Sequence, residues 1–456
     1  MKHKIVFNGC DNHWDNALPF GNGNFGCMLF YEDKKLHIPM NHYEVYYNIS
    51  NNVLPQDILA ASTLCDELGK VHNDYLKRAN LNQPPKGEPF CHYRYTRERQ
   101  YGNPSSYISR SHPSTGELIF SFRDSFNPEK QKLSLFIEDA QGALVLENNE
   151  EKVQIDTIVA RKDYIVNTVK QSANNIVSEL TIAFPEYRDA DAPSVAYQQQ
   201  DENTVSYTVT SMLSKEKSFI FCGVLGFLGA KVTIKKIEGN SAVLSLRDAE
   251  TEFRVVTGIF TEWNYENLPK NALSQIATVA KNIPTLLKEH KEYWRRFFER
   301  SSIVLPDKFL EKVYVLNQYA LDCCSGKDGV MKHHSCGLNG LWDIRRPTLW
   351  GSMWYWDVNI QAAFAGVFSS NRLELAKVFS DGLLSYVGLA EKFAKDVHGL
   401  SGVATDYPYA FYYSCWSWCA QYLWFLYEYS LDEEYLRKEA YPLFLKLCEF
   451  TVGIFE

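Results

Sequence analysis

The spacing of apolar residues changes once along this chain, near residue 270, and this change sets the fold class. Before it, apolar and polar side chains alternate, as in TVSYTVT and in KLSLFIED, where Leu133, Leu135 and Ile137 share one side. Alternation puts every second side chain on the same face of a strand, whereas the later segments repeat at helical spacing. The sequence therefore predicts a β domain followed by helices.

Strand-like segments recur throughout the first part, with Gly, Asn and Asp between them. They are GELIFSF, DYIVNTV, SELTIAF, KVTIKKI, AVLSL and EFRVVTGIF. Many strands at hairpin spacing are typical of a β-sandwich that contains more than one Greek key. We expect this arrangement up to about residue 270.

The helical part begins with a connector, ALSQIATVAKNIPTLLKEHKEYWRRFFERSSIVLPD. In the helix that follows, residues at four-three-four-three spacing predict one buried face: Phe309, Val313, Leu316, Ala320 and Cys323. Asn371 with Glu374 three residues later forms a capping-box pattern, which predicts the start of a second helix. Further helices are expected in WSWCAQYLWFLYEYS and EEYLRKEAYPLFLKLCEFTVGIF, and short loops between them predict antiparallel helical hairpins.

Gly21, Gly23 and Gly26 follow the spacing G-x-G-x-x-G, which also occurs in dinucleotide-binding loops. Such a loop needs a buried strand before the first glycine and a helix after the last, because the helix N-terminus holds the pyrophosphate. Here the upstream stretch HWDNALP is polar, and the downstream stretch CMLFYEDKKLHI indicates two strands around a turn at Asp33. The glycines therefore predict a β-hairpin with close backbone packing.

Composition excludes several kinds of partner. The formal net charge is −8 and no run of five basic residues occurs, so nucleic acid is not expected to bind. The run SFIFCGVLGFLGA is too short to cross a membrane, and the N-terminus has no signal-peptide core. The eleven cysteines lack C-x-x-C pairs of metal spacing. We therefore expect reduced thiols, a cytoplasmic protein, and neither metal nor cofactor.

The chain resembles glycoside hydrolase family 95, the α-L-fucosidase-like enzymes, in several separate segments. These include ALPFGNGNFGCMLF, HPSTGELIFSF, HKEYWRRFFERSSIVL, GLNGLW, WGSMWYWDVNIQ and the last helices. The resemblance implies a β-supersandwich domain over residues 1–270, a helical linker over 271–303, and the first half of an α/α six-hairpin toroid over 304–456. It also implies that the general acid follows the helix AYPLFLKLCEF, beyond Glu456, so that residues 1–456 alone have no turnover.

The loop HHSCGLNGLWDIRRPTLWGSMWYWDVNIQ mixes imidazole, carboxylate, guanidinium and indole groups, which few structural loops do. The family positions its water with an Asn-x-Asn pair, and the matching residues here are Asp357 and Asn359. The first Asn is replaced by Asp, and a carboxylate can accept a proton from water whereas an amide only orients it. We expect these two residues to be catalytic. The alternative is that Asp357 caps the following helix.

Other candidate residues are assigned to substrate binding. They are His334, Trp342, Trp350, Tyr355, Trp356, Asp406 and Trp418. Trp rings suit the apolar face of a sugar, and aromatic residues make up 14% of this chain. A structural role is the alternative for His334 and Trp342, as plain packing is for Asp406 and Trp418.

The expected function is removal of terminal α-L-fucose, or of a similar L-sugar, from oligosaccharides or glycans, with inversion at the anomeric carbon. Two alternatives remain open. One is another six-hairpin-toroid enzyme, such as a disaccharide phosphorylase or an α-glycosidase, and the other is a sugar-binding protein without catalysis. The expected partner is a carbohydrate substrate, and the sequence leaves the oligomeric state open.

Overall fold

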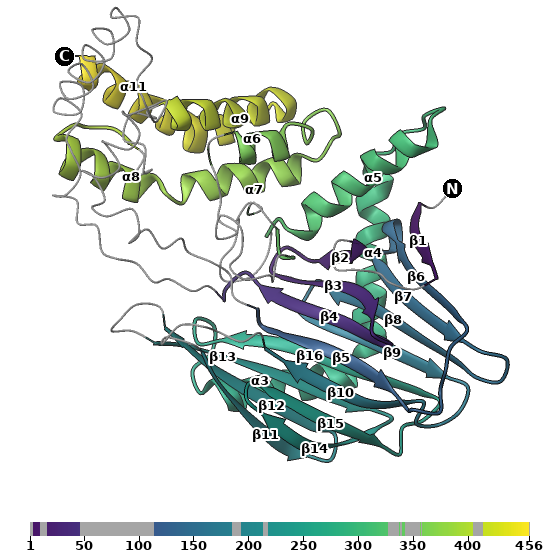
Figure 1. The fold of residues 1–456 in the computed structure, drawn as a ribbon. Helices are drawn as coiled ribbons and strands as arrows, with labels where there is room; N and C mark the ends of the chain where they lie inside the picture. The colour runs from purple at the N-terminus through teal and green to yellow at the C-terminus, as the bar shows by residue number, and fades with distance from the viewer. Residues whose placement is uncertain are drawn as a thin grey trace, which may run out of the picture. The chain divides into compact units, whose positions relative to one another are not determined.

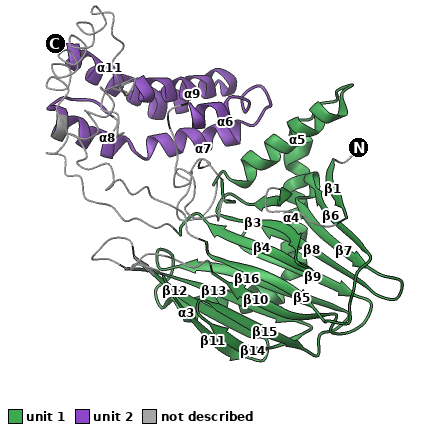
Figure 2. Cartoon of the chain, in the orientation of Figure 1, with its two compact units in different colours: residues 1–48, 110–353 green, residues 49–109, 354–456 purple. Residues whose placement is uncertain are grey.

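The computed structural model describes residues 3–9, 16–45, 114–184, 193–212, 218–326, 337, 340–342, 356, 358–404 and 414–455. The chain divides into two compact units (Figure 2). Unit 1 comprises residues 1–48 and 110–353, and unit 2 comprises residues 49–109 and 354–456. Unit 1 contains all the described strands, three α-helices and one short 3₁₀ helix, whereas the described elements of unit 2 are all helical (Figure 1).

Unit 1 is built on two antiparallel sheets. The nine-stranded sheet contains, in spatial order, β1 (Lys4–Asn8), β6 (Lys130–Phe136), β7 (Gln141–Glu147), β8 (Lys152–Ala160), β9 (Tyr164–Gln171), β16 (Glu252–Thr261), β13 (Ser218–Leu228), β12 (Thr204–Met212) and β11 (Ser194–Asp201). The seven-stranded sheet contains β14 (Lys231–Glu238), β15 (Ser241–Arg247), β10 (Val177–Ala183), β5 (Gly116–Phe122), β4 (Lys35–His42), β3 (Phe25–Glu32) and β2 (Leu18–Gly21). The predicted fold class, a β-sandwich followed by helices, is confirmed.

The alternating residues fill the space between the sheets. Leu133 and Leu135 of β6 are buried, as is Ile137 in the short helix η4 (Ile137–Asp139) that follows. The two sheets approach so closely that a Cβ on Gly142 of β7 would lie 2.7 Å from the ring of Phe20 on β2. Burial of these apolar side chains, at about 25 cal/mol for each Å² of apolar surface, is the main force that holds the sandwich together.

The first hairpin has the predicted form. β3 pairs with β4, and the turn between them contains Asp33 and Lys34 with φ angles of 48° and 59°. Positive φ at both central residues is typical of the tight turns whose twist matches that of paired strands. Because a strand and not a helix follows Gly26, the structure rules out a dinucleotide loop at these glycines.

Two helices pack on the nine-stranded sheet. α3 (Leu268–Lys281) and α4 (Ile283–Arg300) place Leu268, Ile276 and Leu286 against β8, β9, β13 and β16. The ring of His290 on α4 is buried, and its Nε2–H donates to the carbonyl oxygen of Asp139 over 3.0 Å. The predicted division at residues 270 and 303 stays a prediction.

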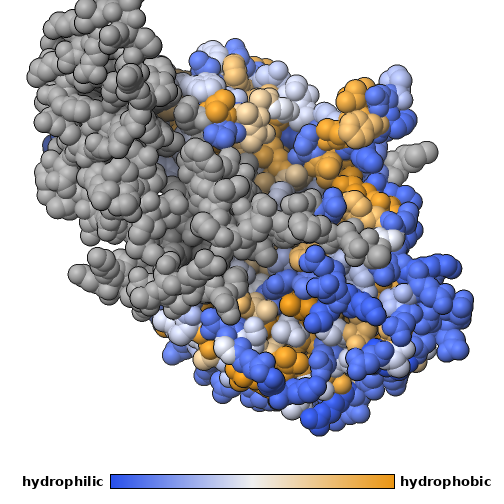
Figure 3. Space-filling model, viewed as in Figure 1, coloured by the Kyte–Doolittle hydropathy of each residue, from blue (hydrophilic) through white to orange (hydrophobic). Residues whose placement is uncertain are grey.

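The next helix, α5 (Lys308–Cys323), exists as predicted, but of the five residues predicted to form its buried face only Cys323 is buried. Phe309 is 67% exposed, and Figure 3 shows hydrophobic side chains at the surface over this helix. The buried residues are Glu311, Val315, Tyr319, Asp322 and Cys323. The two carboxylates are tolerated because they are bonded: Glu311 accepts from the Leu305 N–H over 2.7 Å, and Asp322 accepts from the Tyr293 hydroxyl over 2.8 Å.

Unit 2 consists of short and medium helices in its described part. They are α6 (Asn359–Phe364), α7 (Leu373–Leu384), α8 (Val387–Phe393), η6 (Ala394–His398), α9 (Ser414–Ser430), α10 (Glu433–Tyr435), η7 (Leu436–Ala440) and α11 (Tyr441–Phe455). The capping box predicted at Asn371 is wrong, because α7 has Arg372 as its N-cap, without a side-chain capping bond, and Asn371 has a φ of 56°. α7 and α9 pack against each other.

Candidate functional site

The structure describes four of the nine predicted site residues: Trp342, Trp356, Asn359 and Trp418. Asp357, His334, Trp350, Tyr355 and Asp406 lie outside the described residues. Trp342 belongs to unit 1, and the other three described residues belong to unit 2.

In unit 2, α6 carries Asn359 at its first position, where the side chain is exposed. The preceding residue, Val358, is the N-cap and has φ 67° and ψ −42°. A β-branched residue at positive φ is an outlier, because its Cβ crowds the backbone in that conformation. The strained residue therefore lies directly between the two predicted catalytic residues, Asp357 and Asn359.

A buried amide holds this segment in place. Gln361 on α6 is 1% exposed, and its Nε2–H donates to the carbonyl oxygen of Trp356 over 2.6 Å. The same nitrogen lies 3.1 Å from the sulfur of Cys419 on α9, and the hydroxyl of Tyr422 donates to the Gln361 carbonyl oxygen over 2.7 Å. Burial raises the pKa of Tyr422, so its hydroxyl keeps its proton and remains a donor.

The ring of Trp356 is fixed by other aromatic rings. It contacts Phe379 edge to face at a centroid distance of 5.5 Å, and Tyr386 at 6.3 Å. Phe379 in turn stacks on Tyr422 at 4.9 Å. Trp356 keeps part of its surface exposed, and Trp418, the neighbour of Cys419, is 37% exposed. The structure thus links Trp356, the start of α6 and the start of α9 through Gln361 and Cys419.

Sequence reasoning did not single out Gln361. The signal was present, because D-V-N-I-Q continues the alternation of polar residues that begins with Asp357 and Asn359. An amide among the apolar residues of NIQAAF is costly to bury unless it is bonded. From this cost one could have predicted that the side chain of Gln361 is hydrogen-bonded within the segment that contains Asp357 and Asn359.

Trp342 in unit 1 has a partly structural role. Its indole Nε1–H donates to the carbonyl oxygen of Phe20 over 2.9 Å, and its side chain is partly exposed. Because the only polar atom of the ring is bonded to the backbone, the ring has only its carbon faces and edges to offer a ligand. The sequence left a structural role open for Trp342, and the hydrogen bond supplies one.

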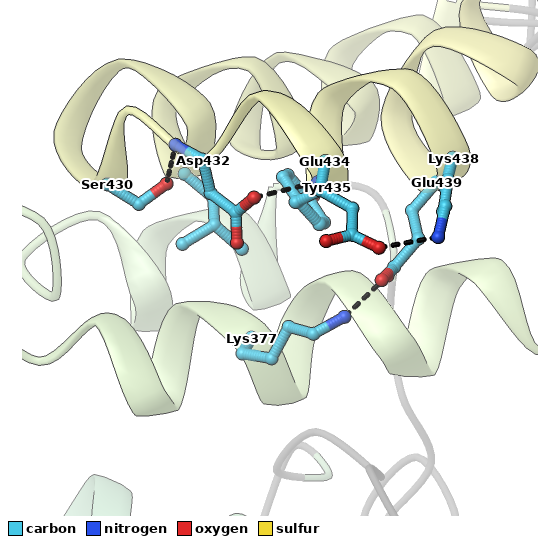
Figure 4. A pocket seen from close by; sticks show the side chains of 8 residues that line it. Lys377, Ser430, Asp432, Glu434, Tyr435, Lys438 and Glu439 are labelled. Carbon is cyan, nitrogen blue, oxygen red and sulfur yellow. Dashed lines mark hydrogen bonds and ion pairs between the residues drawn. The ribbon is translucent and has the colours of Figure 1, made fainter.

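A separate pocket of about 250 Å³ lies in unit 2 (Figure 4). Its polar side chains are largely paired with one another: Lys377 Nζ is 2.5 Å from Glu439, and Lys438 Nζ is 2.5 Å from Glu434. Asp432 accepts from the Tyr435 N–H over 2.9 Å and so caps α10. None of the four described site residues lines this pocket, and we place no catalytic function there.

Two further findings concern the described parts of the chain. They contain no group of three or more His, Cys, Asp or Glu side chains that could hold a metal ion. Within the same residues, none of the helices is long and apolar enough to cross a membrane.

Comparison with known proteins finds a family model that matches part of the chain. Residues 288–455 match the family model of the glycosyl hydrolase family 95 catalytic domain. A comparison with curated proteins finds no match.

Among solved structures, a human-microbiome protein described as a kojibiose phosphorylase is similar, with a TM-score of 0.62 and 12% identity. The alignment covers 98% of this chain, which spans 59% of the length of the phosphorylase structure. The likeness shows a shared fold, a sandwich followed by helices. A family 92 α-mannosidase from Bacteroides thetaiotaomicron aligns over 72% of this chain and 52% of its own, with 10% identity and a TM-score of 0.27, too low to carry an argument.

Proposed function

Residues 288–455 belong to the glycosyl hydrolase family 95 catalytic domains, and on this premise we propose that the protein is a glycosidase that uses Asp357 and Asn359 on water. The proposal includes terminal α-L-fucose, or a similar L-sugar, as the group released, and inversion at the anomeric carbon. Both details come from the family resemblance of the motif that contains these two residues.

The observation that supports the proposal most is the strained backbone at Val358. Strain of about 1–3 kcal/mol at a residue persists only where the surrounding structure enforces it, and such residues gather at active sites. Here the Gln361 bond to the Trp356 carbonyl oxygen fixes the chain on one side of Val358, and α6 fixes it on the other. The strain is therefore consistent with a segment shaped for the orientation of Asp357 and Asn359.

In the proposed mechanism Asn359 orients a water molecule and Asp357 accepts its proton as the water oxygen bonds to the anomeric carbon. The glycosidic C–O bond breaks on the opposite face of the sugar, and a carboxylic acid donates its proton to the leaving oxygen. The family resemblance assigns that acid to the loop after the helix AYPLFLKLCEF, and we retain this position as part of the proposal. An aromatic ring such as that of Trp356, in the same unit as Asn359, would contact the apolar sugar face.

A disaccharide phosphorylase is the second candidate, because the similar structure described as a kojibiose phosphorylase shares the fold over 98% of this chain. A phosphorylase would transfer the glycosyl group to inorganic phosphate in place of water. The proposal favours water because a carboxylate at position 357 can take up the proton that water loses on attack.

The test is a panel of 4-nitrophenyl glycosides and fucosylated oligosaccharides, incubated with the full-length protein with and without inorganic phosphate. The proposal expects release of L-fucose or a similar L-sugar without phosphate. Strict dependence on phosphate would support the phosphorylase, and tight sugar binding without turnover would support a non-catalytic protein. Asp357→Asn separates a base from an orienting group: a loss of about a hundredfold or more in turnover fits a base. The exposed Asp248 supplies the matched control, Asp248→Asn.

A further inference from the structure

Gly21, Gly23 and Gly26 belong to the hairpin formed by β2 and β3, and they lie against the chain at and beyond the end of α5. A Cβ on Gly21 would clash with the carbonyl oxygen of Cys323, and a Cβ on Gly23 would clash with that of Ser325. A Cβ on Gly26 would lie 2.5 Å from the Cβ of Leu341. Real Cβ atoms do not approach other atoms so closely, so only glycine fits at these positions without a shift of the neighbouring backbone.

Direct bonds accompany this close packing. The Gly23 N–H donates to the Cys323 carbonyl oxygen over 2.7 Å, and the Tyr319 hydroxyl donates to the Pro19 carbonyl oxygen over 2.9 Å. The segment before β3 is thus bonded to α5 at two of its residues, Tyr319 and Cys323. These contacts lie within unit 1.

The same hairpin holds the indole of Trp342. The carbonyl oxygen of Phe20 accepts the indole N–H over 2.9 Å, and Leu341, the residue before Trp342, packs on Gly26. In addition, a Cβ on Gly340, which has a φ of 58°, would lie 3.1 Å from the indole ring. The indole therefore lies close to the backbone of both Phe20 and Gly340.

We propose that Gly21, Gly23 and Gly26 are positioning residues that hold Trp342 as a fixed platform for the apolar face of a sugar. This inference rests on the proposed glycosidase function. A ring that is already immobilised loses little conformational freedom when a ligand binds, and affinity gains accordingly. Because the indole N–H is bonded to Phe20, the sugar contacts the carbon surface of the ring and gains no hydrogen bond from it.

The experiment compares Gly26→Ala and Trp342→Phe with the wild type in the full-length protein. Gly26→Ala displaces Leu341 and with it Trp342, whereas Trp342→Phe keeps an aromatic ring but removes the bond to Phe20. Gly388→Ala is the matched control, since a Cβ on Gly388 meets nothing within 4 Å. The readouts are the indole N–H resonance of Trp342 and KM and kcat for 4-nitrophenyl α-L-fucoside.

We expect Gly26→Ala to move the Trp342 resonance. Both variants are expected to raise KM about tenfold, the effect of weakening one contact between an aromatic ring and the sugar, and to change kcat by less than about threefold. An unmoved resonance in Gly26→Ala would overturn the positioning role. A moved resonance in Gly26→Ala, together with an unchanged KM in both variants, would overturn the platform role. Should Gly26→Ala fail to fold, Trp342→Phe still decides through KM. Absence of turnover in the wild type would overturn the proposed function, while the resonance would still report on positioning.

Discussion

The side-chain amide of Gln361 donates a hydrogen bond to the backbone carbonyl oxygen of Trp356, with 2.6 Å between nitrogen and oxygen. This bond spans the segment that contains both predicted catalytic residues. Its donor is almost completely buried, so no water replaces it when it is lost. We therefore expect Gln361 to support the proposed catalytic segment without taking part in the proposed chemistry.

Replacement of Gln361 by Leu is expected to lower the free energy of unfolding by about 1–3 kcal/mol, because the Trp356 carbonyl oxygen loses its donor. The substitution is also expected to lower kcat more than it raises KM, because the segment between Trp356 and Gln361 is no longer held by this bond. Denaturant unfolding measures the first effect and steady-state kinetics the second. Gln198→Leu, at an exposed position of β11, is the control and should change stability by less than about 0.5 kcal/mol. Unchanged stability in Gln361→Leu would show that the bond is unimportant.

Replacement of Val358 by Gly is expected to stabilise the protein, whereas most substitutions destabilise. The φ of 67° at Val358 suits glycine, so Val358→Gly is expected to raise the free energy of unfolding by about 1 kcal/mol and to lower kcat. Val452 on α11 is the matched control, because it is 53% exposed where Val358 is 52% exposed, but is not at positive φ. Val452→Gly should destabilise by about 0.5–1 kcal/mol. If both substitutions destabilise alike in thermal unfolding, Val358 is not strained.

We expect opposite changes in stability when two buried asparagines, Asn41 and Asn22, are each replaced by Leu. Asn41 is 1% exposed, and within the described structure neither atom of its amide has a hydrogen-bond partner. The amide of Asn22 donates to Ala160 and Asp163 and accepts from the Phe25 N–H. Asn41→Leu is therefore expected to leave stability unchanged or to raise it by about 1 kcal/mol, and Asn22→Leu to lower it by about 2 kcal/mol or more. Equal losses in chemical denaturation would mean that Asn41 has a partner after all.

Acid should weaken unit 1 through His290. Burial lowers the pKa of this imidazole to about 4, against 6.5 for an exposed one. Between these two pH values the unfolded chain binds the proton and the folded chain does not, so stability falls as the pH drops from 6.5 to 4. At about 1.4 kcal/mol for each pKa unit, the loss is about 3 kcal/mol at most.

Denaturation curves of the wild type and His290→Gln at several pH values between 4 and 7.5 test this dependence. The variant should show a smaller loss of stability on acidification. Burial also lowers the pKa of His398 in unit 2 to about 4, so His398→Gln is the comparison that separates the two contributions. Identical pH profiles for the wild type and His290→Gln would contradict the prediction.

The sequence predicted the strands well because their burial follows a local rule. Alternation of apolar residues, as in β6 and β12, is visible within seven to nine residues and needs no knowledge of distant partners. The same holds for the Asp33–Lys34 turn and for the existence of α5.

The buried face of α5 could not be predicted in this way. It contains Glu311 and Asp322, whose burial depends on partners far away in the sequence, including His3, 308 residues from Glu311, and Arg161, 161 residues from Asp322. Apolar spacing instead favoured Phe309, which is exposed. Nor could the sequence show that Gly21, Gly23 and Gly26 make room for residues near positions 323–341, because that contact depends on the tertiary fold.

The most direct test of the account is the turnover of Asp357→Ala in the full-length protein, measured with 4-nitrophenyl α-L-fucoside beside the wild type and Asp248→Ala. We expect the wild type and Asp248→Ala to release the sugar at similar rates. Asp357→Ala should be slower by about a hundredfold or more, because the attacking water loses its base. Turnover by Asp357→Ala at the wild-type rate would contradict the account.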